Sequence, residues 1–145
     1  MTGRVSDSQG MVAGMSPALL DGVFVFVTTD DPHTQQILFP QARASFREAE
    51  GWSFIVTADL ARQQNLPVEQ QMRQITLNVL SDLEGVGLTA AVSGVLADHG
   101  IAANVVAAYR HDHIFVPAAR AEDALALLQT LQAQAASRKA RFRSS

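Results

Sequence analysis

The segment from Met72 to Leu131 has the clearest organisation in the chain, because its apolar pattern changes in steps from strand to helix and back. Alternating apolar residues predict a strand over 73–80, and apolar residues at steps of three and four predict a helix around Leu88 to Leu96. Gly100 supplies the left-handed residue that ends such a helix. The elements expected next are a strand, a turn, a strand and a helix, at 101–108, 110–112, 113–116 and 121–131. This order, βαββα, is most of a ferredoxin-like α+β fold.

The segment also resembles an ACT domain. The resemblance is carried by GVGLTAAVSGVLADHGIAANVV and then HDHIFVPAARAEDALALL, and it is closest to aspartate-kinase-type ACT repeats and to small stand-alone bacterial ACT proteins. A weaker likeness covers MSPALLDGVFVFVTT and ARASFREAEGWSFIV. The resemblance implies a βαββαβ-type ACT fold in two interlocked units, with antiparallel sheets and helices on one face. It also implies a non-enzymatic regulatory module that binds an amino acid or similar small effector at a paired interface, as a homodimer.

The C-terminal half lacks the last strand of a complete βαββαβ unit. After Leu131 the chain reads QAQAASRKARFRSS, which is too polar and basic for a buried strand. Because an unpaired sheet edge favours association with other strands, we expect another segment to cover it. The sequence favours Val23 to Thr28, from the same chain or from a partner chain, as the strand that fills or extends the sheet there, since that run is strongly β-prone.

The N-terminal half has shorter and weaker patterns. After the strand at 23–28 we expect a loop over 29–41, with a turn at Asp30-Asp31-Pro32. Ala42, Phe46 and Ala49 form a stripe that indicates a short helix closed by Gly51. The remaining elements are a strand at 52–57, a helical turn at 58–64 and a linker at 65–71. The expected parts of the chain are a disordered N-terminus (1–10), an N-terminal ACT-like unit (11–68), a C-terminal ACT domain (69–135) and a basic flexible tail (136–145).

Composition excludes several classes of protein. The chain has 145 residues, no cysteine and a formal charge of −3. These values argue against disulfides, cysteine-type zinc sites and general nucleic-acid binding, which depends on neutralising phosphates. No apolar run approaches the roughly 20 residues that span a bilayer, and the first ten residues lack the apolar core of a secretory signal. We expect a cytoplasmic protein with no membrane association and no cofactor.

The first candidate site is the junction between the strand at 73–80 and the helix that follows. Ser81 to Glu84 can form a capping box, and Gly85 and Gly87 would let backbone N–H groups approach a ligand at a helix N-terminus. On spacing alone, glycines that allow close packing explain the pattern at least as well. The ACT resemblance shifts the balance, since family ligands sit at this loop and against the next strand. It nominates as ligand-binding residues Ser81, Asp82, Val86, Gly87, Leu88, Thr89, Asn104 and Val105.

Two further features have simpler explanations. His111 and His113 straddle a turn without a third ligand at metal spacing, so a turn stabilised by Asp112 is the better interpretation. Arg138, Lys139, Arg141 and Arg143 could form a basic arm for an acidic partner or nucleic acid, but a solvated helix end explains them more simply. Two alternatives to effector binding stay open. One is a structural module that binds another protein through a sheet edge; the other is a small enzyme, for which no nucleophile motif is present.

Overall fold

The computed structural model describes residues 8–79 and 86–144. The described chain divides into two compact units. The N-terminal unit comprises residues 21–73, and the C-terminal unit comprises residues 8–20 together with the described residues from 74 onward. The sequence assigns residues 11–20 to the N-terminal unit, but in the structure they belong to the C-terminal one. Each unit is built on the order βαββα.

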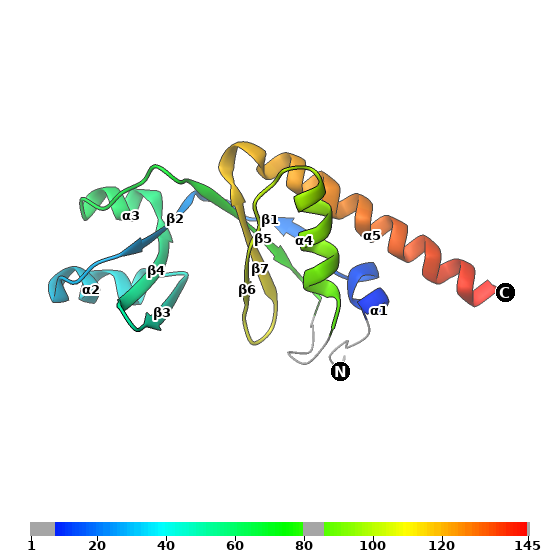
Figure 1. Ribbon diagram of the computed structural model, residues 1–145, viewed down its shortest axis with the longest axis horizontal. Helices are drawn as coiled ribbons and strands as arrows, with labels where there is room; N and C mark the ends of the chain where they lie inside the picture. The colour runs from blue at the N-terminus through cyan, green and yellow to red at the C-terminus, as the bar shows by residue number, and fades with distance from the viewer. Residues whose placement is uncertain (1–7, 80–85, 145) are drawn as a thin grey trace. The chain divides into compact units, whose positions relative to one another are not determined.

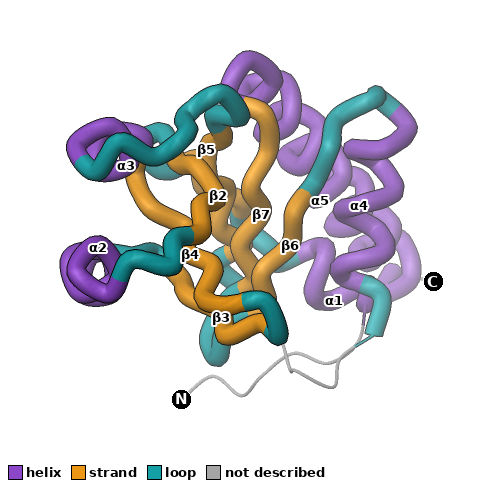
Figure 2. The backbone as a smooth tube through the Cα atoms, turned by 60° about the vertical axis from the view of Figure 1, so that its left-hand side comes forward, coloured by secondary structure: helices purple, strands orange, loops and turns teal. Residues whose placement is uncertain are grey.

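The C-terminal unit has four strands in the order β1-β5-β7-β6. Its strands are β1 (Pro17–Leu19), β5 (Met72–Leu77), β6 (Asn104–Ala107) and β7 (Asp112–Pro117). Its helices are α1 (Ser8–Ala13), α4 (Leu88–Asp98), the short 3₁₀ helix η2 (Ala118–Arg120) and α5 (Ala121–Ser144). Figure 2 shows α1, α4 and α5 together on one side of β6 and β7. The expected strand at 101–108 is shorter than predicted and begins at Asn104.

The missing fourth strand is supplied by the segment that precedes the N-terminal unit. β1 pairs antiparallel with β5, in the register Pro17↔Leu77 and Leu19↔Ile75. Hydrogen bonds extend the pairing at both ends, since the Leu20 N–H donates to Gln74 O at 2.9 Å and the Asn78 N–H donates to Met15 O at 2.7 Å. The edge of β5 is thus filled mainly by β1 rather than by Val23 to Thr28, as predicted, although that run does extend the strand order, because it pairs with the start of β5 at Phe24↔Met72. Because β1 precedes residues 21–73 and β5 follows them, the two units are interlocked along the sequence.

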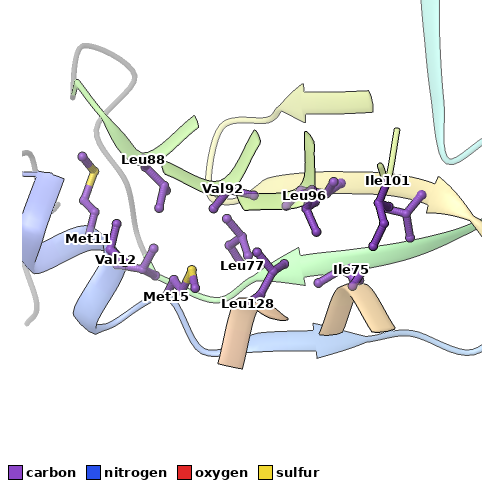
Figure 3. Close-up of a cluster of buried hydrophobic side chains, with 14 of the residues drawn as sticks. Met11, Val12, Met15, Ile75, Leu77, Leu88, Val92, Leu96, Ile101 and Leu128 are labelled. Atoms are coloured by element: carbon purple, nitrogen blue, oxygen red, sulfur yellow. The ribbon is translucent and has the colours of Figure 1, made fainter. Parts of the chain in front are cut away.

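The core of the C-terminal unit lies between its sheet and its helices. Figure 3 shows the apolar side chains of α1, β5, α4 and α5 pointing toward one another. Burying a side chain of this size contributes about 1.5–3 kcal/mol, so this cluster fixes how the helices sit on the sheet. Its fully or almost fully buried members include Met15, Ile75, Leu77, Val92, Leu96, Ile114, Val116 and Leu128.

α5 continues well beyond the residues expected to be helical. It runs without a break from Ala121 to Ser144, so the expected flexible tail at 136–145 is helical over its described residues. Alanine, lysine and arginine are all strong helix formers, which accounts for the continuation. Residues 8–10 of the expected disordered terminus are likewise helical, as part of α1, and residues 1–7 lie outside the described chain.

The N-terminal unit has strands in the order β3-β4-β2, with a single pair between Phe24 and Met72 at the start of β5. Its elements are β2 (Phe24–Thr28), α2 (Pro32–Leu38), the 3₁₀ helix η1 (Phe39–Gln41), β3 (Ala44–Glu48), β4 (Gly51–Thr57) and α3 (Ala58–Gln63). In Figure 1, α2 and α3 lie on the same side of these strands. A separate apolar core is formed by Val25, Val27, Leu38, Phe54, Val56 and Leu60 with small neighbours.

Two elements of this unit differ from the prediction. The expected loop at 29–41 contains α2, which begins where the Asp31 carboxylate accepts a hydrogen bond from the Thr34 N–H at 3.0 Å. The expected helix from Ala42 is instead β3, an edge strand that pairs antiparallel with β4. Its largest side chain, Phe46, is 71% exposed, so the apolar residues at helical spacing do not define a buried face.

Candidate ligand-binding site

The start of α4 is set by one glycine and three buried side chains. Gly87 is the N-cap, with φ of 105°, in the left-handed region that favours glycine. Its carbonyl accepts a hydrogen bond from the Ala91 N–H at 2.9 Å. Leu88, Val92 and Leu96 follow at four-residue steps and are buried, which holds the helix against β5 and β7. Gly87 therefore lies just before the first residue of α4.

A groove of about 250 Å³ opens beside Gly87, within the C-terminal unit. Three helices form it: α1 on one side, the first turn of α4 on another, and α5 from Leu131 to Arg138 on the third. A volume of this size suits a molecule as small as an amino acid rather than a nucleotide, since sites for drug-sized ligands run to about 300–1,000 Å³. The lining residues are Gln9, Val12, Gly87, Ala91, Leu131, Ala135 and Arg138.

Of the nominated residues that the structure describes, Gly87 alone lines the groove. Leu88 is 3% exposed and belongs to the core, while Val86 is 78% exposed beside the groove. Thr89 is exposed on the first turn of α4. Ser81 and Asp82, like the predicted capping box, lie outside the described residues. A groove therefore borders the nominated junction at Gly87.

Asn104 and Val105 are not brought to this groove within one chain. Both lie at the start of β6, which follows the C-terminal end of α4, whereas the groove lies at the N-terminal end of that helix. The 11 residues of α4 separate the two places by about 16 Å at 1.5 Å per residue. The Asn104 side chain is half-buried, and its amide donates to the Phe115 carbonyl across the β6–β7 pair at 3.2 Å.

The other walls of the groove were not predicted from the sequence. Gln9 and Val12 come from a segment of which most was expected to be disordered or to belong to the other unit. Leu131, Ala135 and Arg138 follow at steps of four and three on α5, so they share one face of that helix. This spacing was the available signal, and it becomes informative only once α5 is known to extend beyond Leu131.

His111 and His113 both have hydrogen-bond partners on neighbouring segments of the C-terminal unit. His113 Nδ1 lies 2.9 Å from Thr76 Oγ1 and 3.1 Å from Gln74 Nε2, and both of these β5 side chains are buried. His111 Nδ1 lies 3.2 Å from the Val79 carbonyl. Over residues 8–79 and 86–144, no group of three or more histidine, aspartate or glutamate side chains is placed to hold a metal. His113 thus provides a hydrogen-bond partner for Thr76 Oγ1 and Gln74 Nε2 on strand β5, whereas Gln74 Oε1 is buried without one among the described residues.

None of the described helices combines the length and the apolar character that crossing a membrane requires.

Similarity to known proteins agrees with the fold. Models of the ACT domain family match residues 5–73 and 69–130. A protein of unknown function from Vibrio cholerae, described as a possible transport protein, is 39% identical with a TM-score of 0.75, over 86% of this chain and 94% of that chain. The regulatory subunit of aspartate kinase from Thermus thermophilus is 15% identical with a TM-score of 0.58, over 81% and 97%. The aspartokinase α and β subunits are 13% identical with a TM-score of 0.55, over 79% and 95%.

No curated protein matches the chain at a significant level. The two family matches nevertheless follow one another along the chain and meet at the start of β5, and the ferredoxin-like order of elements in each unit fits them. The first match includes residues 8–20, which pack with the C-terminal unit. The chain belongs to the ACT domain family and carries two ACT domains in tandem.

Proposed function

We propose that this protein is a non-enzymatic regulatory module that binds an amino acid or a similar small effector in the groove at the start of α4. The observation that carries the proposal is the groove itself, which opens at Gly87, in the strand–helix junction nominated as the ligand loop. The fold shared with the regulatory subunit of aspartate kinase supports a regulatory role. The expected homodimer and cytoplasmic location stay predictions.

Regulation would operate by linkage. An effector that binds one arrangement of the protein more tightly than another shifts the population toward the first arrangement, by no more than its difference in affinity. The groove is formed by α1, α4 and α5, and α5 extends from it as one continuous helix to Ser144. A ligand that contacts all three helices would therefore favour the arrangement in which they are packed as described.

A thermal-shift screen of the purified protein against the common amino acids and their α-keto acids tests this proposal. A ligand at 100 times its dissociation constant stabilises the folded state by about 2.7 kcal/mol, which is readily seen as a rise in melting temperature. Ala91 and Ala90 offer a matched pair of variants, since they are adjacent alanines on α4 but only Ala91 lines the groove. We expect Ala91→Leu to abolish the shift and Ala90→Leu to retain it.

A second function, protein binding without a ligand, is favoured by one feature of the N-terminal unit. Val25 and Val27 of β2 face its core, so Phe26 faces the opposite side of the sheet. Phe46 is paired with Ser53, next to buried Phe54, and faces that side too. Phe26 is 47% exposed and Phe46 is 71% exposed. If no compound shifts the melting temperature, and Phe46→Ser abolishes self-association or capture of a partner, this second function replaces the first.

A further inference from the structure

The groove is apolar over most of its lining, with two polar residues. Val12, Ala91, Leu131 and Ala135 contribute hydrocarbon, whereas Gln9 contributes an amide and Arg138 a guanidinium. None of the seven lining residues is acidic. An amino acid that enters this groove with its side chain against the apolar walls would bury hydrocarbon there, at about 25 cal/mol for each Å² removed from water.

Arg138 is placed at the groove by the regular structure of α5. It follows Leu131 and Ala135 at steps of four and three, so it shares their face of the helix. Ala135 is 2% exposed and packs in the core of the C-terminal unit, which anchors the helix one turn before Arg138. Gln132 adds a second anchor, because its side-chain amide donates to the Ala13 carbonyl at the end of α1 at 3.0 Å.

The charge of the lining selects the class of ligand. A guanidinium presents several N–H donors in a plane and matches a carboxylate in geometry and in charge. Among the lining residues that the structure describes, a single cation lies beside apolar walls and none is acidic, which complements an anionic group attached to a small apolar body. Amino acids with acidic or basic side chains would instead place the additional charge of the side chain against Val12, Ala91 and Leu131, where desolvation is costly.

We propose that Arg138 is the residue that recognises the carboxylate of the ligand, and that the ligand is a small carboxylate with an apolar side chain. This inference rests on the proposed function and adds the ligand class and a role for the C-terminal extension of α5. Of the basic residues after Ala135, Arg138 then has a role in ligand binding and is more than part of a solvated helix end.

Isothermal titration calorimetry with the full chain tests the assignment. The probes are L-leucine and L-valine, each compared with its amide, L-leucinamide or L-valinamide, which keeps the side chain and lacks the carboxylate. We expect Arg138→Gln to weaken binding of both amino acids roughly tenfold, the effect of losing one charge-assisted hydrogen bond, and to leave the affinity for the amides unchanged. Arg141→Gln is the matched control, because Arg141 is exposed on the same helix and does not line the groove.

The outcomes separate this assignment from the proposed function. Leucine or valine binding that depends on Arg138 and not on Arg141 supports the assignment. Equal affinities of the wild type and Arg138→Gln for leucine and valine overturn the assignment. Wild-type binding of a polar or charged amino acid, but of neither leucine nor valine, also overturns it. In both cases the proposed function stands. If the wild type binds none of the common amino acids, both fail. Unchanged melting temperatures of the unliganded variants show that any loss is not a folding defect.

Discussion

The first helix after the first strand begins differently in the two ACT units. In the N-terminal unit, the Asp31 carboxylate accepts hydrogen bonds from the Thr34 N–H at 3.0 Å and the Thr34 hydroxyl at 2.6 Å. In the C-terminal unit, the corresponding helix begins at Gly87, which has no side chain and adopts a left-handed conformation. At the N-terminus of this helix, the N-terminal unit has the Asp31 carboxylate, whereas the C-terminal unit has Gly87 and a groove beside it.

This difference indicates how two copies of one plan can diverge. A carboxylate at the start of a helix satisfies backbone donors and complements the helix dipole. In the N-terminal unit Asp31 does this permanently, and α2 needs nothing further at that end. In the C-terminal unit the place is bordered by Val12, Ala91 and Arg138. The comparison gives the start of α2 a structural role and supports the proposal that the ligand binds to the C-terminal unit.

The largest expected effect comes from truncating one core at a time. Leu96 and Leu38 are both fully buried, in the C-terminal and N-terminal cores respectively. Each change to alanine should lower the free energy of unfolding by about 2–5 kcal/mol. Trp52, the single tryptophan, lies in the N-terminal unit at 4.9 Å from the Phe39 ring. Tryptophan fluorescence should therefore report mainly on Leu38→Ala, while only Leu96→Ala should also weaken ligand binding.

A smaller effect is expected from glycines that need positive φ. Gly87 has φ of 105° and Gly51 has φ of 136°. Alanine at either position should destabilise its unit by about 1–2 kcal/mol, since a side chain is strained in this region. Chemical denaturation measures this loss of stability, and calorimetry with an amino acid that binds the wild type measures the change in ligand affinity. Binding should weaken with Gly87→Ala and not with Gly51→Ala; equal losses would contradict a site at the start of α4.

The smallest effect concerns the charge of Asp31. The hydrogen bonds from the Thr34 hydroxyl and backbone N–H hold the pKa of the Asp31 carboxyl below its ordinary value of 3.8. A lowered folded-state pKa means that the carboxylate stabilises the protein above pH 3.8, and that this contribution is lost as the pH falls through the folded pKa. Asp31→Asn should thus lower the melting temperature slightly at neutral pH, with the difference from wild type vanishing in stronger acid. Its ligand binding at pH 7 should be unchanged.

The strongly periodic elements of the fold were predictable from the sequence. The apolar steps from Leu88 to Leu96 gave α4, and the alternation around Ile75 and Leu77 gave β5. These signals are reliable because each element has one long buried face. The buried faces of these elements also made the βαββα order of the C-terminal unit predictable. The resemblance to ACT domains is carried by the same stretch of sequence.

Short and exposed elements were not predictable in the same way. α2 has only Ile37 and Leu38 as large apolar residues, although Asp31-Pro32 is a recognisable N-cap with proline in the first turn. β3 is an edge strand with exposed side chains, so its identity depends on pairing with β4. β1 has three residues, too few for any period, and only the tertiary structure reveals that they complete the sheet next to β5.

The candidate site was predictable in part for a related reason. Gly87 could be nominated because a glycine at a strand–helix junction is itself a local signal. The other lining residues are far from Gly87 in the chain: Gln9 and Val12 lie about 80 residues before it, and Arg138 lies about 50 residues after it. No local sequence pattern links them to Gly87. Asn104, by contrast, was nominated by resemblance alone, and within one chain it lies at the far end of α4.

Hydrogen–deuterium exchange measured by mass spectrometry, with and without a saturating mixture of the common amino acids, tests the central claim most directly. The account predicts slower exchange at the start of α4, around Gly87 to Ala91, and along α5 around Leu131 to Arg138. Exchange over α2, whose N-terminus is already capped by Asp31, should be unchanged. Protection confined to the N-terminal unit, or no protection in either unit, would contradict the proposal that the C-terminal ACT domain binds the effector.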